Sequence, residues 1–111
     1  MNLLISIGGH PGETFRFVVG DVAVGSFALP ALLTNAKGKK AMAVLLTCED
    51  NDARFTFGGT IPTQGAAGVG HVLAEGGSVR ITNSYAIYSA LIINAVNGDD
   101  AVIQATLEYE E

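Results

Sequence analysis

Polar and hydrophobic residues alternate along much of the chain, which is the pattern of strands with one face in a core and the other in solvent. The alternation is clearest over 101–109, where aliphatic, alanine and tyrosine side chains fall on one face and polar side chains on the other. Shorter alternating runs span 15–19, 53–57 and 78–82. We expect a short, half-buried strand at each of these four places.

Four further segments are strand candidates without such clear alternation. Residues 41–48 form a dense apolar run, 3–7 and 71–74 are weaker candidates, and 86–96 is apolar on both faces. The dipeptide Asn97-Gly98 follows 86–96, and it predicts a two-residue hairpin turn into the last strand because both residues tolerate positive φ. No segment has the pattern of an amphipathic helix.

Eight short strands punctuated by glycine and proline predict an all-β fold. We expect a single antiparallel domain over 1–111, either a β-sandwich or jelly-roll-like, in which 1–40 is the least regular part. A long loop interrupts the strands, because seven of the 14 glycines lie between Gly58 and Gly77. Within it, 65–70 has the order GxxGxG, which is not the dinucleotide-binding order and precedes no helix pattern.

The composition points to burial of surface in an assembly. Of the 111 residues, 49% are hydrophobic and only 15% are charged, which excludes intrinsic disorder and leaves few charges to cover a monomer. We therefore expect a homo-oligomer or a part of a larger assembly. Six basic against 11 acidic residues give a net charge of −5, which disfavours nucleic acid as a partner.

The chain lacks a segment that would take it to a membrane. Its longest uninterrupted apolar run, 41–46, is far shorter than the roughly 20 residues that cross a bilayer. Residues 1–9 lack the basic region and the long apolar region of a secretory signal. We expect synthesis in a cytoplasm and no membrane partner.

The reactive residue types do not form a recognisable catalytic or metal-binding set. Cys48 is the single cysteine and lies in an apolar strand, and His10 and His71 are far apart in the sequence. The acidic turn 49–52 lacks the spacing of a calcium loop, so a plain turn is favoured. No GxSxG nucleophile motif is present. We predict no enzymatic activity, no cofactor and no metal.

Tyr85 and Tyr88, next to Asn83 and Ser84, are open to two interpretations. Aromatic rings stack on sugars while amides hydrogen-bond hydroxyl groups, so the segment could bind carbohydrate. Packing at the end of a strand is the other interpretation, and the absence of tryptophan favours it.

Two segments are candidate protein interfaces. Lys37, Lys39 and Lys40 hold half of the positive charge, and they form either a solvated turn or a contact with an acidic neighbour. The second segment is the uncharged part of the glycine-rich loop, where glycine lets a partner approach the backbone closely. Its candidate residues are Thr60, Pro62, Gly65, Gly68 and Gly70.

Four stretches resemble small β-sandwich virion proteins of tailed bacteriophages: DARFTFGGTIPT at 52–63, VGHVL at 69–73, GGSV at 76–79 and QATLEY at 104–109. In those proteins a strand of the form (V/A)-R-(F/W/Y) leads into G-G-T-x-P-T and then G-H-x-L-x-x-G, and the last strand is similar to N-x-T-Y-E-Y. Leu107 departs from this pattern because an aromatic residue is usual there. The resemblance covers about 41–109.

The resemblance implies a structural protein of the virion, made in the host cytoplasm, that binds the major capsid protein or other virion proteins. Capsid decoration, in which a cement protein stabilises the shell, is the leading expectation. A neck or tail component is the alternative within this class. A small carbohydrate- or ligand-binding β-sandwich is the alternative from a different class.

Overall fold

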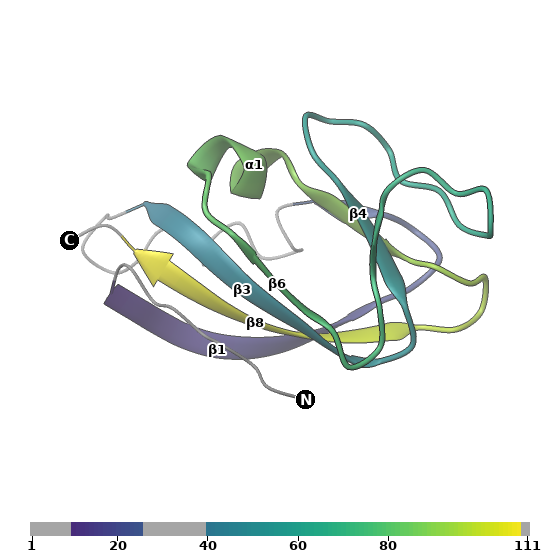
Figure 1. Ribbon diagram of the computed structural model, residues 1–111, viewed down its shortest axis with the longest axis horizontal. Helices are drawn as coiled ribbons and strands as arrows, with labels where there is room; N and C mark the ends of the chain where they lie inside the picture. The colour runs from purple at the N-terminus through teal and green to yellow at the C-terminus, as the bar shows by residue number, and fades with distance from the viewer. Residues whose placement is uncertain (1–9, 26–39, 110–111) are drawn as a thin grey trace.

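Strands dominate the computed structural model, which describes residues 10–25 and 40–109 (Figure 1). The elements are β1 (His10–Val19), β2 (Val24–Gly25), β3 (Ala41–Asp50), β4 (Ala53–Thr56), β5 (His71–Leu73), β6 (Ser78–Ile81), α1 (Ser84–Ser89), β7 (Leu91–Asn94) and β8 (Ala101–Tyr109). The strand expected at 3–7 lies outside the described residues.

The strands form two four-stranded sheets, which confirms the all-β prediction. One sheet has the order β1-β8-β3-β6, and the other has the order β2-β7-β4-β5. Antiparallel pairing joins β1 to β8, β2 to β7, β3 to β6 and β4 to β5. This nested pairing is that of a long hairpin rolled into two sheets, which is a jelly roll.

The hydrophobic core lies between the two sheets and follows the alternation expected from the sequence. In β8 the side chains of Ile103 and Leu107 are buried, whereas those of Gln104 and Thr106 are partly exposed. Buried residues of both sheets belong to one cluster: Phe17, Val19, Ala41, Val44, Leu46, Cys48, Ala53, Phe55, Leu73, Ile81, Ile87, Ala90, Ile92, Ala101, Ile103, Ala105, Leu107 and Tyr109. Burial of this shared apolar surface stabilises the sandwich.

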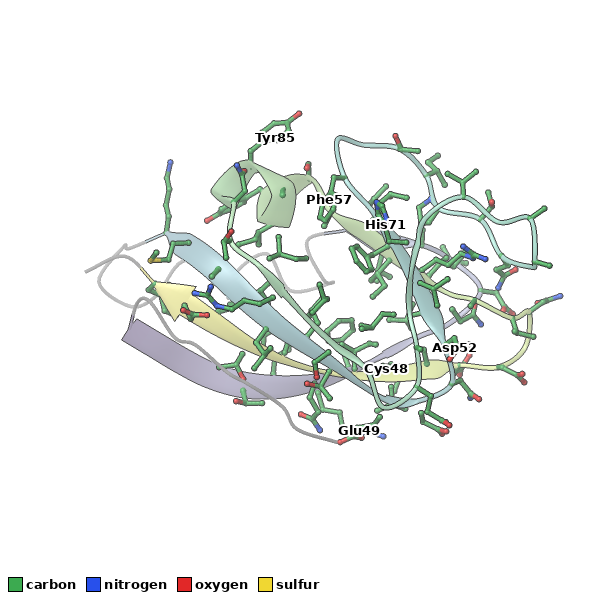
Figure 2. All side chains as sticks on the ribbon, viewed as in Figure 1. Cys48, Glu49, Asp52, Phe57, His71 and Tyr85 are labelled. Carbon is green, nitrogen blue, oxygen red and sulfur yellow. The ribbon has the colours of Figure 1, made fainter. Side chains whose placement is uncertain are left out.

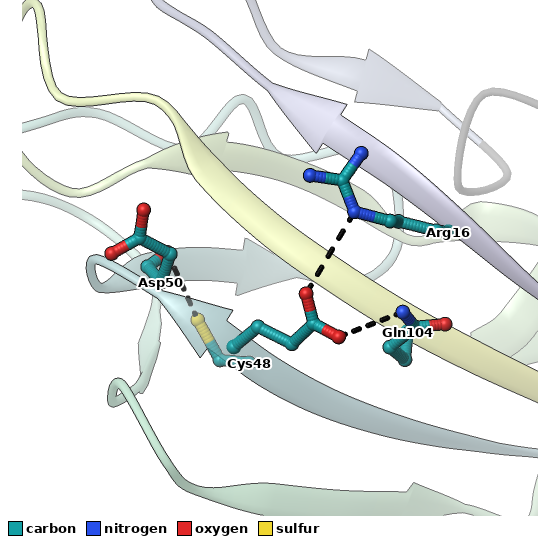
Figure 3. A network of polar contacts seen from close by, with 5 residues as sticks. Arg16, Cys48, Asp50 and Gln104 are labelled. Carbon is teal, nitrogen blue, oxygen red and sulfur yellow. Dashed lines mark hydrogen bonds and ion pairs between the residues drawn. The ribbon is translucent and has the colours of Figure 1, made fainter.

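Polar contacts run across the outer face of the β1-β8-β3-β6 sheet. Glu49 of β3 accepts a hydrogen bond from Gln104 of β8 at 2.8 Å and lies 3.7 Å from the Arg16 guanidinium of β1. Figure 3 labels Arg16 and Gln104, each at one end of a dashed contact. Arg80 of β6 donates two hydrogen bonds of 2.7 Å to Glu108, whose side chain is 2% exposed. These contacts tie neighbouring and next-neighbouring strands together.

The prediction of one strand over 86–96 is wrong, because this segment contains the end of a helix followed by a shorter strand. Residues 84–89 form α1, whose N-cap Asn83 accepts a hydrogen bond from the Ala86 amide at 3.1 Å. Only 91–94 form a strand. A short run that is apolar on both faces suits either a buried strand or a buried helical turn, and the cap decides between them here.

The expected hairpin at Asn97-Gly98 is also wrong. β7 and β8 lie in different sheets, so the connection crosses from one sheet to the other. Gly98 has a φ of 86°, whereas Asn97 does not adopt a positive φ. The Asp99 amide donates to the Val96 carbonyl at 3.0 Å. A type I′ hairpin turn would need positive φ at both central residues.

Candidate interaction surface

The glycine-rich loop 57–70 is folded around a single arginine. Arg54 points outward from β4, because its neighbours Ala53 and Phe55 point into the core. Its guanidinium donates hydrogen bonds to the carbonyl oxygens of Gly70 at 2.9 Å and Gly65 at 3.0 Å. These hydrogen bonds therefore hold the loop against the outer face of the β2-β7-β4-β5 sheet in a defined, compact conformation.

Gly68 uses the small size of glycine inside the loop itself. A Cβ atom at this position would lie 2.3 Å from the Thr63 carbonyl oxygen and 2.8 Å from Nε of Arg54. That Nε is buried and has no hydrogen-bond partner in the described part of the chain. At Gly68, the absence of a side chain therefore allows close packing within the loop itself and against Arg54, rather than against a partner.

Asp21 ties the same loop to two others. Its Oδ1 accepts hydrogen bonds from the Gly98 amide at 2.9 Å, Asn94 Nδ2 at 2.8 Å and Gln64 Nε2 at 3.0 Å. These hydrogen bonds lower the pKa of Asp21 below its ordinary value of 3.8; the Gly98 amide has the largest effect, followed by Asn94 and then Gln64. The β1–β2, β4–β5 and β7–β8 connections therefore meet at one carboxylate.

The hydrogen bonds to Asp21 are expected to make the stability of the protein depend on pH. Because the folded-state pKa is lowered, the stabilisation is present above pH 3.8 and is lost as the pH falls through the folded value. Asp21→Asn is expected to melt at a lower temperature than the wild type at pH 7, and the difference is expected to shrink below pH 3.8. Thermal melts followed by circular dichroism measure it. A gap that stays constant down to pH 2 would contradict this role.

The structure distributes the candidate interface residues differently. Thr60 and Gly65 are exposed, Gly68 and Gly70 are partly exposed, and Pro62 is buried. Pro62 is therefore not available for contact with a partner in this conformation, whereas the other four residues reach the surface.

Only one of the three candidate lysines can be placed. Lys40 is exposed and directly precedes β3. Lys37 and Lys39 lie outside the described residues.

An aromatic cluster that the sequence analysis missed lies beside the loop. The ring centroids of Phe55, Phe57 and His71 are separated by 5.6 Å, 5.5 Å and 6.3 Å for the pairs 55–57, 55–71 and 57–71. Figure 2 shows Phe57 and His71 next to each other at this side of the sandwich. The cluster depends on the pairing of β4 with β5, which places Phe55 opposite His71, and no local sequence pattern predicted that pairing.

Two hollows flank Phe57 and His71. The first has a volume of about 390 Å³ and is lined by Thr56, Phe57, Thr60, Val69, Gly70 and His71. The second has a volume of about 380 Å³ and is lined by Phe55, Phe57, His71, Val79, Arg80, Ile81, Thr82, Asn83 and Ala86. The second lies where β5 and β6, the edge strands of the two sheets, face each other.

The tyrosines of the proposed sugar platform lie on α1, not at the end of a strand. Tyr85 is 74% exposed and Tyr88 is 39% exposed. Asn83 uses its side-chain oxygen to cap the helix. The packing interpretation therefore does not describe Tyr85, whose ring is mostly in solvent.

Cys48 is buried, as its apolar strand predicts. Its thiol contacts the carbonyl oxygen of Asp50 (Figure 3) and that of Asn51, and burial raises the pKa of the thiol. A raised pKa disfavours the reactive thiolate.

The acidic turn is occupied with structural contacts. Asp52 accepts a hydrogen bond from the Glu75 amide at 2.8 Å, and Glu75 accepts one from the Asn51 amide at 2.9 Å. Within 10–25 and 40–109, no group of three or more histidine, cysteine or acidic side chains is placed to hold a metal ion.

Comparisons with known proteins add one weak structural similarity. No family model matches the chain, and no curated protein matches its sequence. A chain from the structure of Bacillus endospore appendages, described as a novel family of disulfide-linked pili, is similar over 99% of this chain and 98% of its own length, with 12% identity and a TM-score of 0.46. Both values are low, so this similarity transfers no property to the protein.

In the part of the chain that the structure describes, no helix is long and apolar enough to cross a bilayer.

Proposed function

We propose that this protein is a structural protein of a tailed-phage virion, a decoration or cement protein that stabilises the shell by binding the major capsid protein. The observation that carries the proposal is the jelly-roll connectivity in a chain whose strands and turns resemble those of small phage virion proteins. Jelly rolls serve as viral capsid domains and as lectin domains. A fold supports this role by analogy only, so the contacts need a direct test.

The candidate docking surfaces are the exposed part of the glycine-rich loop and the lysine segment 37–40. The loop is already held by Arg54 and by Asp21 through Gln64. A prefolded loop loses little conformational entropy when it binds. The positive charges of these lysines would steer the otherwise acidic protein toward an acidic shell.

The proposal is tested by binding of the protein to phage shells that lack it, across a salt series. Changing Lys37, Lys39 and Lys40 to glutamate is expected to weaken binding and reduce its salt dependence, because exposed interfacial charges are screened within about 8–10 Å. Comparing Lys40→Glu with Arg16→Glu, which changes the net charge equally, separates a local from a global charge effect.

Cryo-electron microscopy of the intact particle then locates the protein. Density on the shell surface supports decoration, and density at the neck or tail supports the alternative role within the virion. Absence from purified particles would overturn the proposal.

A small carbohydrate- or ligand-binding protein is the second candidate. The observation that favours it is the pair of hollows beside Phe57 and His71, which also carry the hydroxyl groups of Thr60 and Thr82. Nuclear magnetic resonance titration with mono- and oligosaccharides tests it. Saturable shifts confined to His71 and its neighbours would favour this function over the virion role.

A further inference from the structure

Three described segments, 57–61, 69–71 and 82–89, contain none of the 17 acidic, lysine and arginine residues of the chain (6 basic, 11 acidic). We call the side of the molecule that these segments form the charge-free face, and Arg80 lies at its border. Figure 2 shows Tyr85, Phe57 and His71 on this side and Glu49 and Asp52 on the opposite side. Because the chain has a net charge of −5, this uncharged composition distinguishes the face from the acidic character of the chain as a whole.

The three segments form one continuous surface. The Gly58 amide donates to Oγ of Ser89 at 3.0 Å, which joins the start of the loop to the end of α1. The first hollow joins Phe57 and His71 to Val69, and the second joins the same two rings to Ala86 of α1. Arg80 borders the second hollow, but its charge is paired with Glu108.

The charge-free face has both projections and depressions. Tyr85 is 74% exposed, Ile61 is 70% exposed and Val69 is 50% exposed. Val69 lines the hollow of about 390 Å³, and Ala86 of α1, which follows Tyr85 in the chain, lines the hollow of about 380 Å³. An exposed tyrosine beside apolar depressions is typical of the centre of a protein interface.

We propose that the charge-free face binds the same face of a second copy of this chain around a twofold axis, with Tyr85 of each copy in the hollow beside Phe57 and His71 of the other. Two copies of an acidic chain repel each other, and contact through this face brings no carboxylates together. An isologous contact also requires a surface that is complementary to itself, and here the projections and the depressions lie on one face. The inference does not depend on the proposed virion role.

Sedimentation equilibrium of the full chain over a concentration series tests the proposal. The wild type is expected to dimerise, and Tyr85→Ala is expected to raise the dimer dissociation constant about tenfold or more, the usual effect of removing an interface tyrosine. Ile61→Ser, in the loop, is expected to weaken the dimer without touching α1. Val96→Ser is the matched control, because Val96 is 53% exposed and lies outside the face.

Salt provides an independent readout. An uncharged contact between two acidic chains is expected to stay equally strong or to strengthen from 50 mM to 500 mM NaCl, since salt screens the repulsion between the copies. Circular dichroism melts verify that each variant is folded.

Three results would overturn the proposal. They are a wild type that is monomeric at all concentrations, a dimer that Val96→Ser weakens as much as Tyr85→Ala does, and a dimer that dissociates as salt is added. A monomer that binds a saccharide at His71 would assign the same hollows to a small ligand instead.

Discussion

Replacing Leu46 with alanine is expected to destabilise the protein by about 2–5 kcal/mol, the usual cost of a large-to-small change in a packed core. Leu46 is fully buried between the two sheets. Its neighbour Leu45 points to the outer face and is only partly buried. Leu45→Ala is expected to cost about 1 kcal/mol or less, because less apolar surface leaves contact with the protein.

Urea unfolding of the two variants measures both values. The pair is internally matched, since each variant removes the same atoms from adjacent positions of β3. Equal destabilisation would contradict the assignment of faces in β3. A larger cost for Leu45 would mean that the strand is shifted by one residue, which exchanges its two faces.

Gly68→Ala is expected to lower the free energy of unfolding by about 2–3 kcal/mol, although the residue lies in a surface loop. The added Cβ would lie 2.3 Å from the Thr63 carbonyl oxygen, so the loop must shift and strain its backbone or lose the hydrogen bonds to Arg54. Overpacking of this kind costs about 1–3 kcal/mol. A contact with a backbone atom puts Gly68 at the upper end, because the backbone yields less than a side chain does.

Ala67→Val is the control for Gly68→Ala, because it adds bulk at the neighbouring exposed position. It is expected to change stability by about 0.5 kcal/mol or less. Limited proteolysis gives a second readout, since a displaced loop is expected to be cut faster within 60–70. If Gly68→Ala were as stable and as resistant as Ala67→Val, the loop would not be packed on Arg54 as described.

Local pattern predicted the strands that alternate and the long loop. Side chains alternate between the two faces of a strand at every residue, so five or more residues are enough to assign the buried face of β8 or β1. Glycine and proline likewise mark a loop without any distant contact. Both signals are local, and the buried and exposed sides of these strands follow them.

Local pattern did not separate a helix from a strand in 84–94. The apolar residues there suit either conformation, and only the Asn83 cap together with the burial of Ile87 selects the helix. Asn97-Gly98 suits a hairpin, but β7 pairs with β2 and β4 instead of β8. The competing pairings are made by residues far away in the sequence.

The sequence therefore determined the composition of the charge-free face but not the arrangement of its segments. The absence of charge in 57–61 and 82–89 can be read directly from the residues. Their meeting depends on the rolled topology, because the pairing of β4 with β5 brings His71 to Phe55, and α1 closes the same side. Composition and alternation determined what each segment can bury, whereas the tertiary structure decided which segments share a face, since that depends on strand pairing over long sequence separations.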